Sequence, residues 1–300
     1  MTKILLFGKT GQLGWELERT LAPLGEIVAL GPGELDLTDL DALSRRIKEV
    51  HPQIIVNASA YTAVDHAEEK VDLAMRLNAQ APAVMADTAG VLNAVLIHFS
   101  TDYVFDGEKE AAYTEDDPTN PLNVYGQSKL MGEQAIVRAG CAYLILRTSW
   151  LYSLRGDSFV SKTLAWARQQ ETLRIVSDQV GSPTWARMLA QILAAVLAQS
   201  LIAPQDYFST RSGIYHLGGS GCVSRFDFVR EILLLDPCAE EQNVRSLEEA
   251  STADFPTPAR RPLRTSLDCS RFETIFGLCF PNWRESLRLA MSEQPQKSLS

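Results

Sequence analysis

The stretch KILLFGKTGQLG, residues 3–14, decides the fold of this chain. Lys3–Phe7 is an apolar run with the length of a buried strand, and the amphipathic segment Leu13–Leu24 is typical of a helix. Between them Gly8, Gly11 and Gly14 stand in a G-x-x-G-x-x-G spacing. Small residues at such a turn let the backbone approach a pyrophosphate, whose charge meets free N–H groups at the helix N-terminus. The stretch therefore predicts a dinucleotide-binding βαβ unit, with an ordinary glycine-rich turn as the alternative.

The rest of the first half alternates short apolar runs with amphipathic stretches, which is the pattern of a parallel sheet with crossover helices. Runs without polar alternation suit strands that are covered on both faces. We expect an α/β fold with a doubly wound parallel sheet of the Rossmann type, and ligands at the carboxyl ends of its strands. The further strands are expected at Glu26–Ala29, Ile54–Asn57, Leu96–Ser100 and Ala142–Arg147, and the further helices at Leu40–Val50, Val71–Ala89 and Val124–Ala139.

After Arg147 the pattern loosens, and a smaller C-terminal α+β lobe is expected beside the sheet. We assign residues 1–150 and about 171–220 to the dinucleotide-binding Rossmann domain, and about 151–170 and 221–300 to the lobe that binds the substrate. The polar residues 293–300 are expected to fray. The expected elements are helices at Phe159–Gln170, Trp185–Gln199, from Ser224 to about Leu235 and after Asn282, and strands at Leu173–Val176 and Gly213–Gly218.

The composition limits the partners. A formal net charge of −9 argues against nucleic acid or an anionic membrane as the main partner. The five cysteines are scattered without a C-x-x-C pair, and the four histidines lack metal-ligand spacing, so we expect neither a disulfide framework nor a metal site. The most apolar later stretch, Leu189–Ala203, is shorter than the roughly 20 residues of a membrane span. A soluble, cytoplasmic protein is expected.

Tyr125 and Lys129 form a Tyr-x-x-x-Lys pattern in the predicted helix Val124–Ala139. Residues i and i+4 share one helix face, so the phenol and the ammonium group can converge on one ligand. The unperturbed pKa of tyrosine is about 10, and a nearby lysine cation lowers that pKa toward neutrality, where the phenol becomes a useful acid. The pattern also arises by chance, so its context decides.

That context is Ser100–Phe105 (S-T-D-Y-V-F), which closes a predicted strand. The hydroxyl of Thr101 would lie at the carboxyl edge of the sheet, where it can donate a hydrogen bond to a substrate oxygen. The alternative is that Ser-Thr-Asp only caps a helix or forms a turn. The glycine motif, this segment and the Tyr–Lys pair occur in order at strand ends or on the following helix, which favours a ketone reductase that uses a nicotinamide nucleotide.

Six segments of the chain resemble the dTDP-4-dehydrorhamnose reductase family of extended short-chain dehydrogenases/reductases. The resemblance runs from residue 3 to about 290. It implies NAD(P)H-dependent reduction of the C4 ketone of dTDP-4-dehydro-L-rhamnose to dTDP-L-rhamnose, the last step of dTDP-L-rhamnose biosynthesis. The segments are Gly8–Gly14, Asn57–Asp65 (N-A-S-A-Y-T-A-V-D), Ser100–Phe105, Pro121–Lys129 (P-L-N-V-Y-G-Q-S-K), Arg147–Trp150 (R-T-S-W) and Pro256–Pro262 (P-T-P-A-R-R-P).

The resemblance also implies roles for single residues. Tyr125 would be the proton donor, Lys129 its partner and the anchor of the nicotinamide ribose, and Thr101 the hydroxyl that orients the substrate. For Trp150 the alternative is a core tryptophan, and for Arg261 a structural ion pair. Cofactor contacts are expected at Gly8, Gly11, Gln12, Leu13, Gly14, Ala60, Tyr61 and Thr62 besides Tyr125 and Lys129, and substrate contacts at Thr101, Asp102, Tyr125, Trp150 and Arg261.

The choice between NADPH and NADH stays open. Rossmann folds that bind NAD carry an acid at the end of the second strand, but Leu30-Gly31-Pro32 stands there, and no arginine replaces the acid. Asp36 and Leu37 follow shortly after and can contact the adenine, although Asp36 is equally suited to cap a helix.

Some members of the family resemble metal-bridged dimers whose glutamates meet at a shared interface. Glu16 matches one such ligand, but Arg187 stands where the resemblance requires an acid, and a cation there repels Mg²⁺. We therefore expect no metal and a monomer, with a weak dimer as the alternative.

Other functions of the same fold are distinguished by single residues or by their need for added cofactor. A sugar 4,6-dehydratase resembles this chain but carries Thr-Asp-Glu, whereas this sequence has Thr101-Asp102-Tyr103 and lacks the second carboxylate. A 4-epimerase or another ketosugar reductase would use the same fold and act on another nucleotide sugar. A non-catalytic regulatory subunit is disfavoured because both Tyr125 and Lys129 are present.

Overall fold

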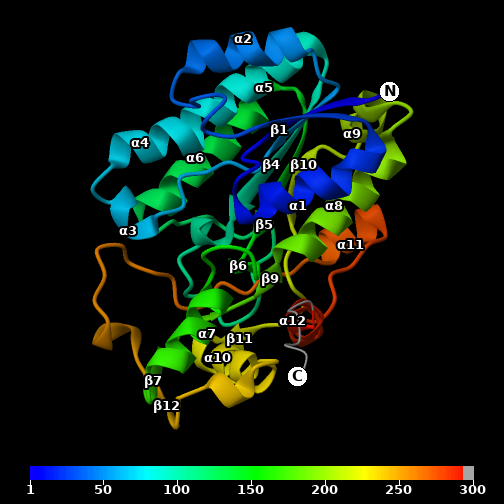
Figure 1. Cartoon of the computed structure of the whole chain (residues 1–300). Coiled ribbons are helices and arrows are strands. Elements are labelled where there is room, and N and C mark those ends of the chain that lie inside the picture. The colour runs from blue at the N-terminus through cyan, green and yellow to red at the C-terminus, as the bar shows by residue number, and fades with distance from the viewer. Residues whose placement is uncertain (293–300) are drawn as a thin grey trace.

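The computed structural model describes residues 1–292, so the expected fraying of residues 293–300 lies outside the described part. Its centre is a six-stranded sheet in the order β10-β5-β4-β3-β1-β2, with every neighbouring pair parallel (Figure 1). The prediction of a doubly wound parallel sheet is confirmed. Its strands are β1 (Lys3–Phe7), β2 (Glu26–Leu30), β3 (Ile54–Asn57), β4 (Val95–Thr101), β5 (Ala142–Thr148) and β10 (Gly213–His216).

Strand β1 is the switch point of the topology. The chain passes from β1 to β2 on one side of it, and β3 returns on the other side. The loops after β1 and β3 therefore diverge at the carboxyl edge of the sheet, which leaves a crevice where such folds bind ligands.

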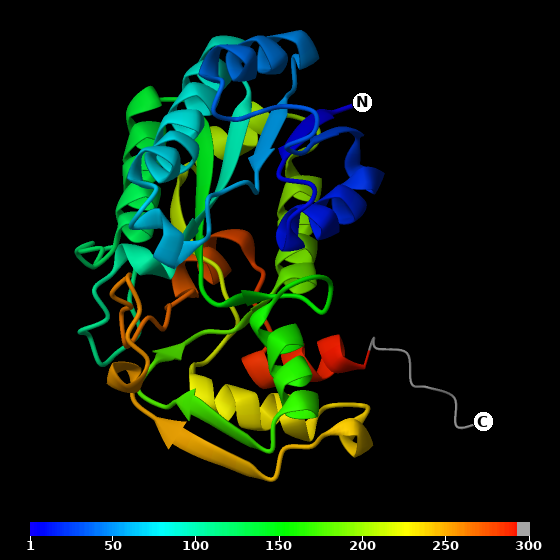
Figure 2. The same ribbon diagram turned by 60° about the vertical axis from the view of Figure 1, so that its left-hand side comes forward.

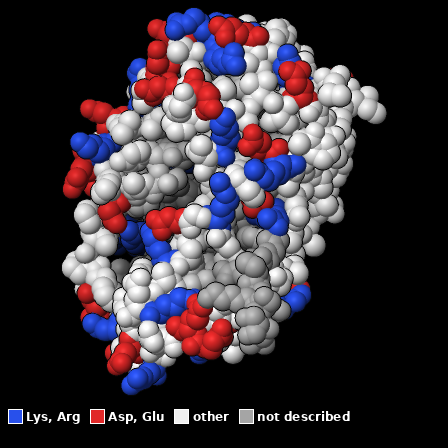
Figure 3. Space-filling model, viewed as in Figure 1, with Lys and Arg blue, Asp and Glu red and all other residues white. Residues whose placement is uncertain are grey.

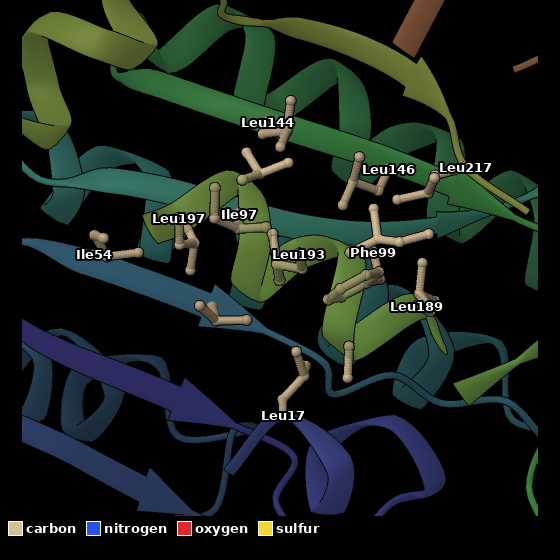
Figure 4. Packing of buried hydrophobic residues seen from close by; sticks show 14 of the residues in the cluster. Leu17, Ile54, Ile97, Phe99, Leu144, Leu146, Leu189, Leu193, Leu197 and Leu217 are labelled. Carbon is tan, nitrogen blue, oxygen red and sulfur yellow. The ribbon is translucent and has the colours of Figure 1, made fainter. Parts of the chain in front are cut away.

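Helices cover both faces of the sheet, which explains why its strands are apolar throughout. One face carries α1 and α8, and the other carries α2, α5 and α6. Figure 4 shows Leu189, Leu193 and Leu197 of α8 on the face of the sheet that carries the strand residues Ile97 and Phe99. These helices are α1 (Gln12–Leu21), continued by η1 (Ala22–Leu24), α2 (Leu40–Val50), α5 (Ala81–Leu92), α6 (Val124–Ala139) and α8 (Ala186–Ser200).

The helix predicted at Val71–Ala89 is interrupted by a π-helical turn. It consists of α4 (Val71–Met75), the π-turn η2 (Arg76–Gln80) and α5. Single π-turns inside helices are frequent at functional sites. The π-turn places the buried Asn78 against α6, and Gly132 of α6 permits the close approach because a Cβ there would collide with the carbonyl oxygen of Asn78.

The C-terminal lobe lies below the carboxyl edge of the sheet (Figures 1 and 2). Its helices α7 (Phe159–Gln169), α10 (Arg225–Leu234) and α12 (Trp283–Met291) agree with the predicted positions. The short paired strands β6 (Leu151–Tyr152) with β9 (Thr184–Trp185), and β8 (Val180–Gly181) with β11 (Val223–Ser224), were not predicted, and neither were α3 (Val64–Ala67), α9 (Pro204–Ser209), α11 (Ser270–Phe276), η3 (Asp102–Val104), η4 (Ala239–Glu241) and η5 (Thr252–Asp254).

Strand β7 (Thr172–Val176) corrects one part of the expected division. We placed it with the Rossmann sheet, but it pairs in parallel with β12 (Ser246–Ala250), an unpredicted strand of the lobe. Its alternating burial, with Leu173 and Ile175 buried, suits a strand covered on one face only. We propose the same division of the chain with β7 moved to the lobe. In the described part of the chain no helix is long and apolar enough to cross a membrane.

Candidate active site

Three adjoining cavities follow the carboxyl edge of the sheet. The glycine-loop cavity of about 590 Å³ lies beside β1 and β2. The central cavity of about 460 Å³ contains Tyr125 and Lys129, and shares Ser59 with the first. The outer cavity of about 530 Å³ lies against the lobe and shares Arg225 and Arg261 with the central one. Figure 3 shows this face hollowed between the sheet and the lobe, with basic side chains inside the lower part of the hollow. Together the cavities form a continuous site for an extended ligand.

The glycine loop lies closely against the loop after β3. Gly8 has φ +88°, and a Cβ there would lie 2.7 Å from the carbonyl carbon of Ala58. A Cβ on Gly14 would collide with the carbonyl oxygen of Gly8, so Gly14 lets α1 pack on the loop. Gly8 and Gly11 line the cavities, whereas Gly14 lines neither. Gly14 therefore has a packing role, and its contact with the pyrophosphate stays a prediction.

Several buried polar atoms at this edge have no hydrogen-bond partner. They are Oε1 of Gln12, Oγ of Ser100 and Oγ1 of Thr148, and all three residues line the central cavity. Buried polar groups are normally paired, so unpaired ones in a cavity indicate a place for a polar ligand. With Gln12 and Leu13 at the N-terminus of α1, where backbone N–H groups lack partners within the helix, these residues fit a dinucleotide.

A carboxylate does lie at the end of β2, although the sequence places none there. Glu34 folds back so that Oε2 accepts a hydrogen bond from the backbone N–H of Gly31 at 2.9 Å, and Oε1 binds Nζ of Lys9 at 2.5 Å. The Lys9 hydrogen bond lowers the pKa of Glu34. Sequence reasoning missed both residues because Glu34 reaches the strand end only through the turn that starts at Gly31.

Asp36 and Leu37 line the glycine-loop cavity, and their contact with the adenine stays a prediction. Oδ1 of Asp36 accepts hydrogen bonds from the backbone N–H and the hydroxyl of Thr38, both at 2.8 Å, and these bonds lower its pKa. Asp36 therefore closes a turn, while the cap of α2 is Asp39, which accepts from the N–H of Ala42.

The loop after β3 is fixed by Asn78. Oδ1 of Asn78 accepts from the N–H of Tyr61 at 2.8 Å, and Nδ2 donates to the carbonyl of Tyr61 at 3.1 Å and to Oγ of Ser128 at 3.0 Å. Ala60 and Thr62 line the central cavity, whereas Tyr61 is not among its lining residues. Asn78 thus joins this loop to α6. No motif marks Asn78 in the sequence.

Tyr125, Thr101 and Asp102 meet in the central cavity. The hydroxyl of Thr101 accepts from the N–H of Tyr103 at 3.2 Å and donates to Oδ1 of Asp102 at 3.1 Å. Thr101 therefore caps η3 and also lines the cavity. Oδ2 of Asp102 accepts from Ser149 at 2.7 Å, and burial raises the pKa of Asp102 against the effect of these hydrogen bonds.

The expected lowering of the pKa of Tyr125 by Lys129 is wrong for this conformation. Burial raises the pKa of Tyr125, the charge of Asp102 adds to the rise, and the Thr101 hydroxyl opposes it. Nζ of Lys129 donates instead to the carbonyl oxygen of Phe99 at 2.6 Å. Burial lowers the pKa of Lys129 to about 8. The phenol accordingly keeps its proton, as a proton donor requires.

The helix that carries Tyr125 and Lys129 is fixed to the sheet by a buried ion pair. Arg147 of β5 binds Glu133 of α6 through two hydrogen bonds, at 2.9 and 2.7 Å. Charged pairs of this bidentate kind have a defined geometry, so the pair holds α6 in one position on β5.

Trp150 lies between the central and outer cavities with a strained backbone. Its φ is +44°, a region that non-glycine residues rarely adopt. Its indole fits because residue 181 is glycine: a Cβ there would lie 2.5 Å from Cε2 of Trp150. Strain of this kind is retained mostly where a site needs the side chain in one place. The alternative of a plain core tryptophan is disfavoured because Trp150 lines both cavities.

Two arginines line both of these cavities. Arg261 binds Asp65 at 2.6 Å, so the structural ion pair expected as the alternative for Arg261 is present, and it joins the lobe to the Rossmann part. The guanidinium of Arg225 lies 3.7 Å from the centroid of Trp150. Burial lowers the pKa of Arg225 to about 10, the neighbouring Arg261 adds to the decrease, and Tyr103 and Asp102 oppose it. Sequence reasoning missed Arg225, which stands at the start of α10 without a motif.

Comparisons with known proteins identify the family of this chain. Residues 1–295 match the family model described as the RmlD substrate binding domain. A dTDP-4-dehydrorhamnose reductase of Burkholderia thailandensis is 39% identical over 97% of this chain and 98% of its own length. One of Escherichia coli is 38% identical, with 97% of each chain covered. The chain belongs to the dTDP-4-dehydrorhamnose reductase family. The crystal structure of the Bacillus anthracis dTDP-4-dehydrorhamnose reductase in complex with NADP superimposes with a TM-score of 0.88 at 31% identity, covering 98% of this chain and 100% of that one.

One feature of this dTDP-4-dehydrorhamnose reductase family member bears on metal binding. Oε2 of Glu16 lies 3.2 Å from Nε of Arg187, so the glutamate that we matched to a metal ligand is engaged by a cation. Within residues 1–292 no group of three or more His, Cys, Asp or Glu side chains could hold a metal ion. Independence from metal stays a prediction.

Proposed function

We propose that this chain catalyses the NAD(P)H-dependent reduction of the C4 ketone of dTDP-4-dehydro-L-rhamnose to dTDP-L-rhamnose, the last step of dTDP-L-rhamnose biosynthesis. The observation that carries the proposal is the central cavity, where Tyr125, Thr101 and Lys129 lie between the glycine loop and Trp150. The dinucleotide would bind on the side of the glycine loop, and the nucleotide sugar on the side of Trp150.

In the proposed reaction Tyr125 donates its proton to O4 of the sugar. Its raised pKa keeps the phenol protonated in the resting enzyme, and a proton placed at the carbonyl oxygen stabilises the charge that develops there. Thr101 orients the carbonyl through its hydroxyl, and Lys129 holds the ribose of the cofactor. The cofactor supplies the hydride when it is bound, and Gly8, Gly11, Gln12, Leu13, Asp36, Leu37, Ala60 and Thr62 are the residues proposed to hold it.

The outer cavity is proposed to bind the dTDP end of the substrate. Trp150 offers an aromatic surface to the sugar at the boundary of the two cavities, Asp102 faces the sugar hydroxyls, and Arg225 and Arg261 offer two cations for the diphosphate. A guanidinium suits phosphate oxygens because its planar donors match them in pairs.

The test is oxidation of NADPH and NADH, followed by absorbance, with enzymatically generated dTDP-4-dehydro-L-rhamnose. Turnover supports the proposal, and the two rates give the cofactor preference. Tyr125→Phe should lower kcat by about 10²–10⁴ with nearly unchanged cofactor affinity. Wild-type turnover in that variant would remove Tyr125 from its role.

The alternatives have less support. A dehydratase lacks its second acid here, because Tyr103 follows Asp102. A 4-epimerase would turn over without added reduced cofactor, so the same assay separates it. A regulatory subunit would bind cofactor without turnover.

We also propose that the enzyme is a cytoplasmic monomer. Support comes from the five cysteines, all free, which suit a reducing compartment. The ion pair of Glu16 with Arg187 also disfavours a metal-bridged dimer. Light scattering at micromolar concentration tests the oligomeric state, and a stable dimer would contradict the proposal.

A further inference from the structure

A row of buried polar side chains lies behind Lys129, and the proposed reaction leaves it unused. Asn57 at the end of β3 and His98 on β4 are paired in register, and their exposed fractions are 1% and 0%, beside 2% for Lys129. Nδ2 of Asn57 lies 3.0 Å from Nδ1 of His98, and Nε2 of His98 lies 3.2 Å from Nζ of Lys129.

Ser59 determines which of the atoms in this row donate and which accept. Its backbone N–H donates to Oδ1 of Asn57 at 3.1 Å, and its hydroxyl donates to the same oxygen at 2.5 Å. A backbone N–H can only donate, so this contact sets which end of the Asn57 amide is the oxygen. Nδ2 then has only hydrogens to offer, and Nδ1 of His98 must be the acceptor. A neutral imidazole that accepts at Nδ1 carries its hydrogen on Nε2.

The hydrogen on Nε2 of His98 therefore points at Nζ of Lys129. An ammonium group has three hydrogens and no lone pair, so it cannot accept this bond. An uncharged amine can accept it and still donate to the carbonyl of Phe99. Burial holds the pKa of His98 well below its usual value, and burial lowers that of Lys129 in the same sense.

The charged groups around these three side chains do not change the direction of the hydrogen bonds. Glu133 lies on the same helix as Lys129 and raises the pKa of Lys129, but both of its oxygens are bound by Arg147 of β5. Tyr125 and Asp102 line the same central cavity as Lys129. The residue of β5 opposite His98 is the apolar Ile145.

We propose that Asn57 and His98 form a one-way hydrogen-bond chain that holds Lys129 as an uncharged amine before the cofactor binds. Ser59, which sets the direction, lines both the glycine-loop and central cavities, so a ligand there acts on the charge of Lys129. When Lys129 leaves His98 for the ribose it takes up a proton from solvent. Asn57 and His98 are positioning residues, and their effect on catalysis rests on the proposed function of Lys129.

The isosteric variant Asn57→Asp tests the chain because a carboxylate can only accept. Nδ1 of His98 must then carry a proton, and Lys129 stays charged to higher pH. In ¹⁵N NMR of the cofactor-free protein we expect Nδ1 of His98 without a proton in the wild type and with one in the variant, with His98→Gln assigning the signal. The basic limb of the pH profile of kcat/KM should move up by about one pH unit in Asn57→Asp.

Asn78→Asp is the matched control, since it makes the same change in another buried amide that has no contact with His98. It should leave the protonation of His98 unchanged. A proton on Nδ1 in the wild type, or the same change in both variants, would refute the proposed hydrogen-bond chain. If Asn57→Asp does not fold, the wild-type spectrum alone decides. The NMR result does not depend on activity. A protein that lacks turnover but shows the expected spectra would refute the proposed function and still support the hydrogen-bond chain.

Discussion

Gly181→Ala is the substitution that most directly tests the placement of Trp150. A Cβ at this position would lie 2.5 Å from Cε2 and 2.6 Å from Nε1 of the Trp150 indole. Ordinary carbon contacts begin near 3.5 Å, so the ring must move by about 1 Å. It has little freedom to do so, because Arg225 lies 3.7 Å from its centroid and its backbone φ is already +44°.

The expected effect falls on the substrate rather than on the cofactor. A misplacement of about 1 Å at a positioning residue can reduce the rate about 10²-fold, so we expect kcat/KM to fall by about 10–100-fold. Gly181 lies far along the chain from the glycine loop and lines neither the central nor the glycine-loop cavity, so NADPH affinity should stay within about twofold of wild type. Overpacking should destabilise the fold by about 1–3 kcal/mol.

The assay is steady-state reduction with varied nucleotide sugar, combined with NADPH binding by fluorescence and thermal unfolding. Gly33→Ala is the matched control, since a Cβ at Gly33 meets nothing within 4 Å. It should behave as wild type. Unchanged kcat/KM in Gly181→Ala would show that the position of Trp150 does not matter to the substrate, and an equal loss of NADPH affinity would show general damage to the site.

Three further predictions use other parts of the site. Arg225→Gln should weaken dTDP binding by about tenfold or more in calorimetry and leave thymidine binding unchanged, because only the diphosphate needs the cation; equal losses would mean that Arg225 acts through packing on Trp150. Glu34→Gln should raise the ratio of kcat/KM for NADPH over NADH by about tenfold, because a carboxylate near the ribose repels a 2′-phosphate and occupies Lys9. Lys9→Gln should lower that ratio, and a change in the same direction for both would refute the assignment. Activity should survive EDTA and gain nothing from Mg²⁺; loss with EDTA and recovery with Mg²⁺ would establish a metal.

The parallel sheet could be predicted because each of its strands leaves a local signal. Ile54–Asn57 is apolar on both faces and ends at a polar residue, and the helix Val124–Ala139 ends at Gly140 in the left-handed conformation. By contrast, β7 and β12 are half-exposed, and their pairing joins segments far apart in the chain. A short amphipathic strand has no local feature that names its partner, so sequence reasoning assigned β7 to the wrong sheet.

The same distinction separates the site residues that were foreseen from those that were missed. Tyr125 and Lys129 are close in sequence and share a helix face, so their spacing alone predicts that they meet. Asn78, His98 and Arg225 act through contacts between elements that are distant in the chain, and no motif marks them. Glu34 was missed for another reason: it lies four residues after the strand end, and a turn brings its carboxylate back to the N–H of Gly31.

The catalytic pair and the substrate-binding residues are held in place by different ion pairs. This difference predicts which substitutions should affect kcat and which should affect KM. The helix that carries Tyr125 and Lys129 is tied to β5 by the buried Glu133–Arg147 pair. Trp150 and Arg225 instead lie at the boundary of the lobe, which the part-exposed Arg261–Asp65 pair joins to the Rossmann part. Breaking a buried ion pair by removing one partner destabilises a protein by about 3–5 kcal/mol, whereas an exposed pair contributes about 1 kcal/mol or less. Removing one partner of the Glu133–Arg147 pair should therefore lower kcat and stability together, while removing one partner of the Arg261–Asp65 pair should raise KM and leave the fold nearly intact.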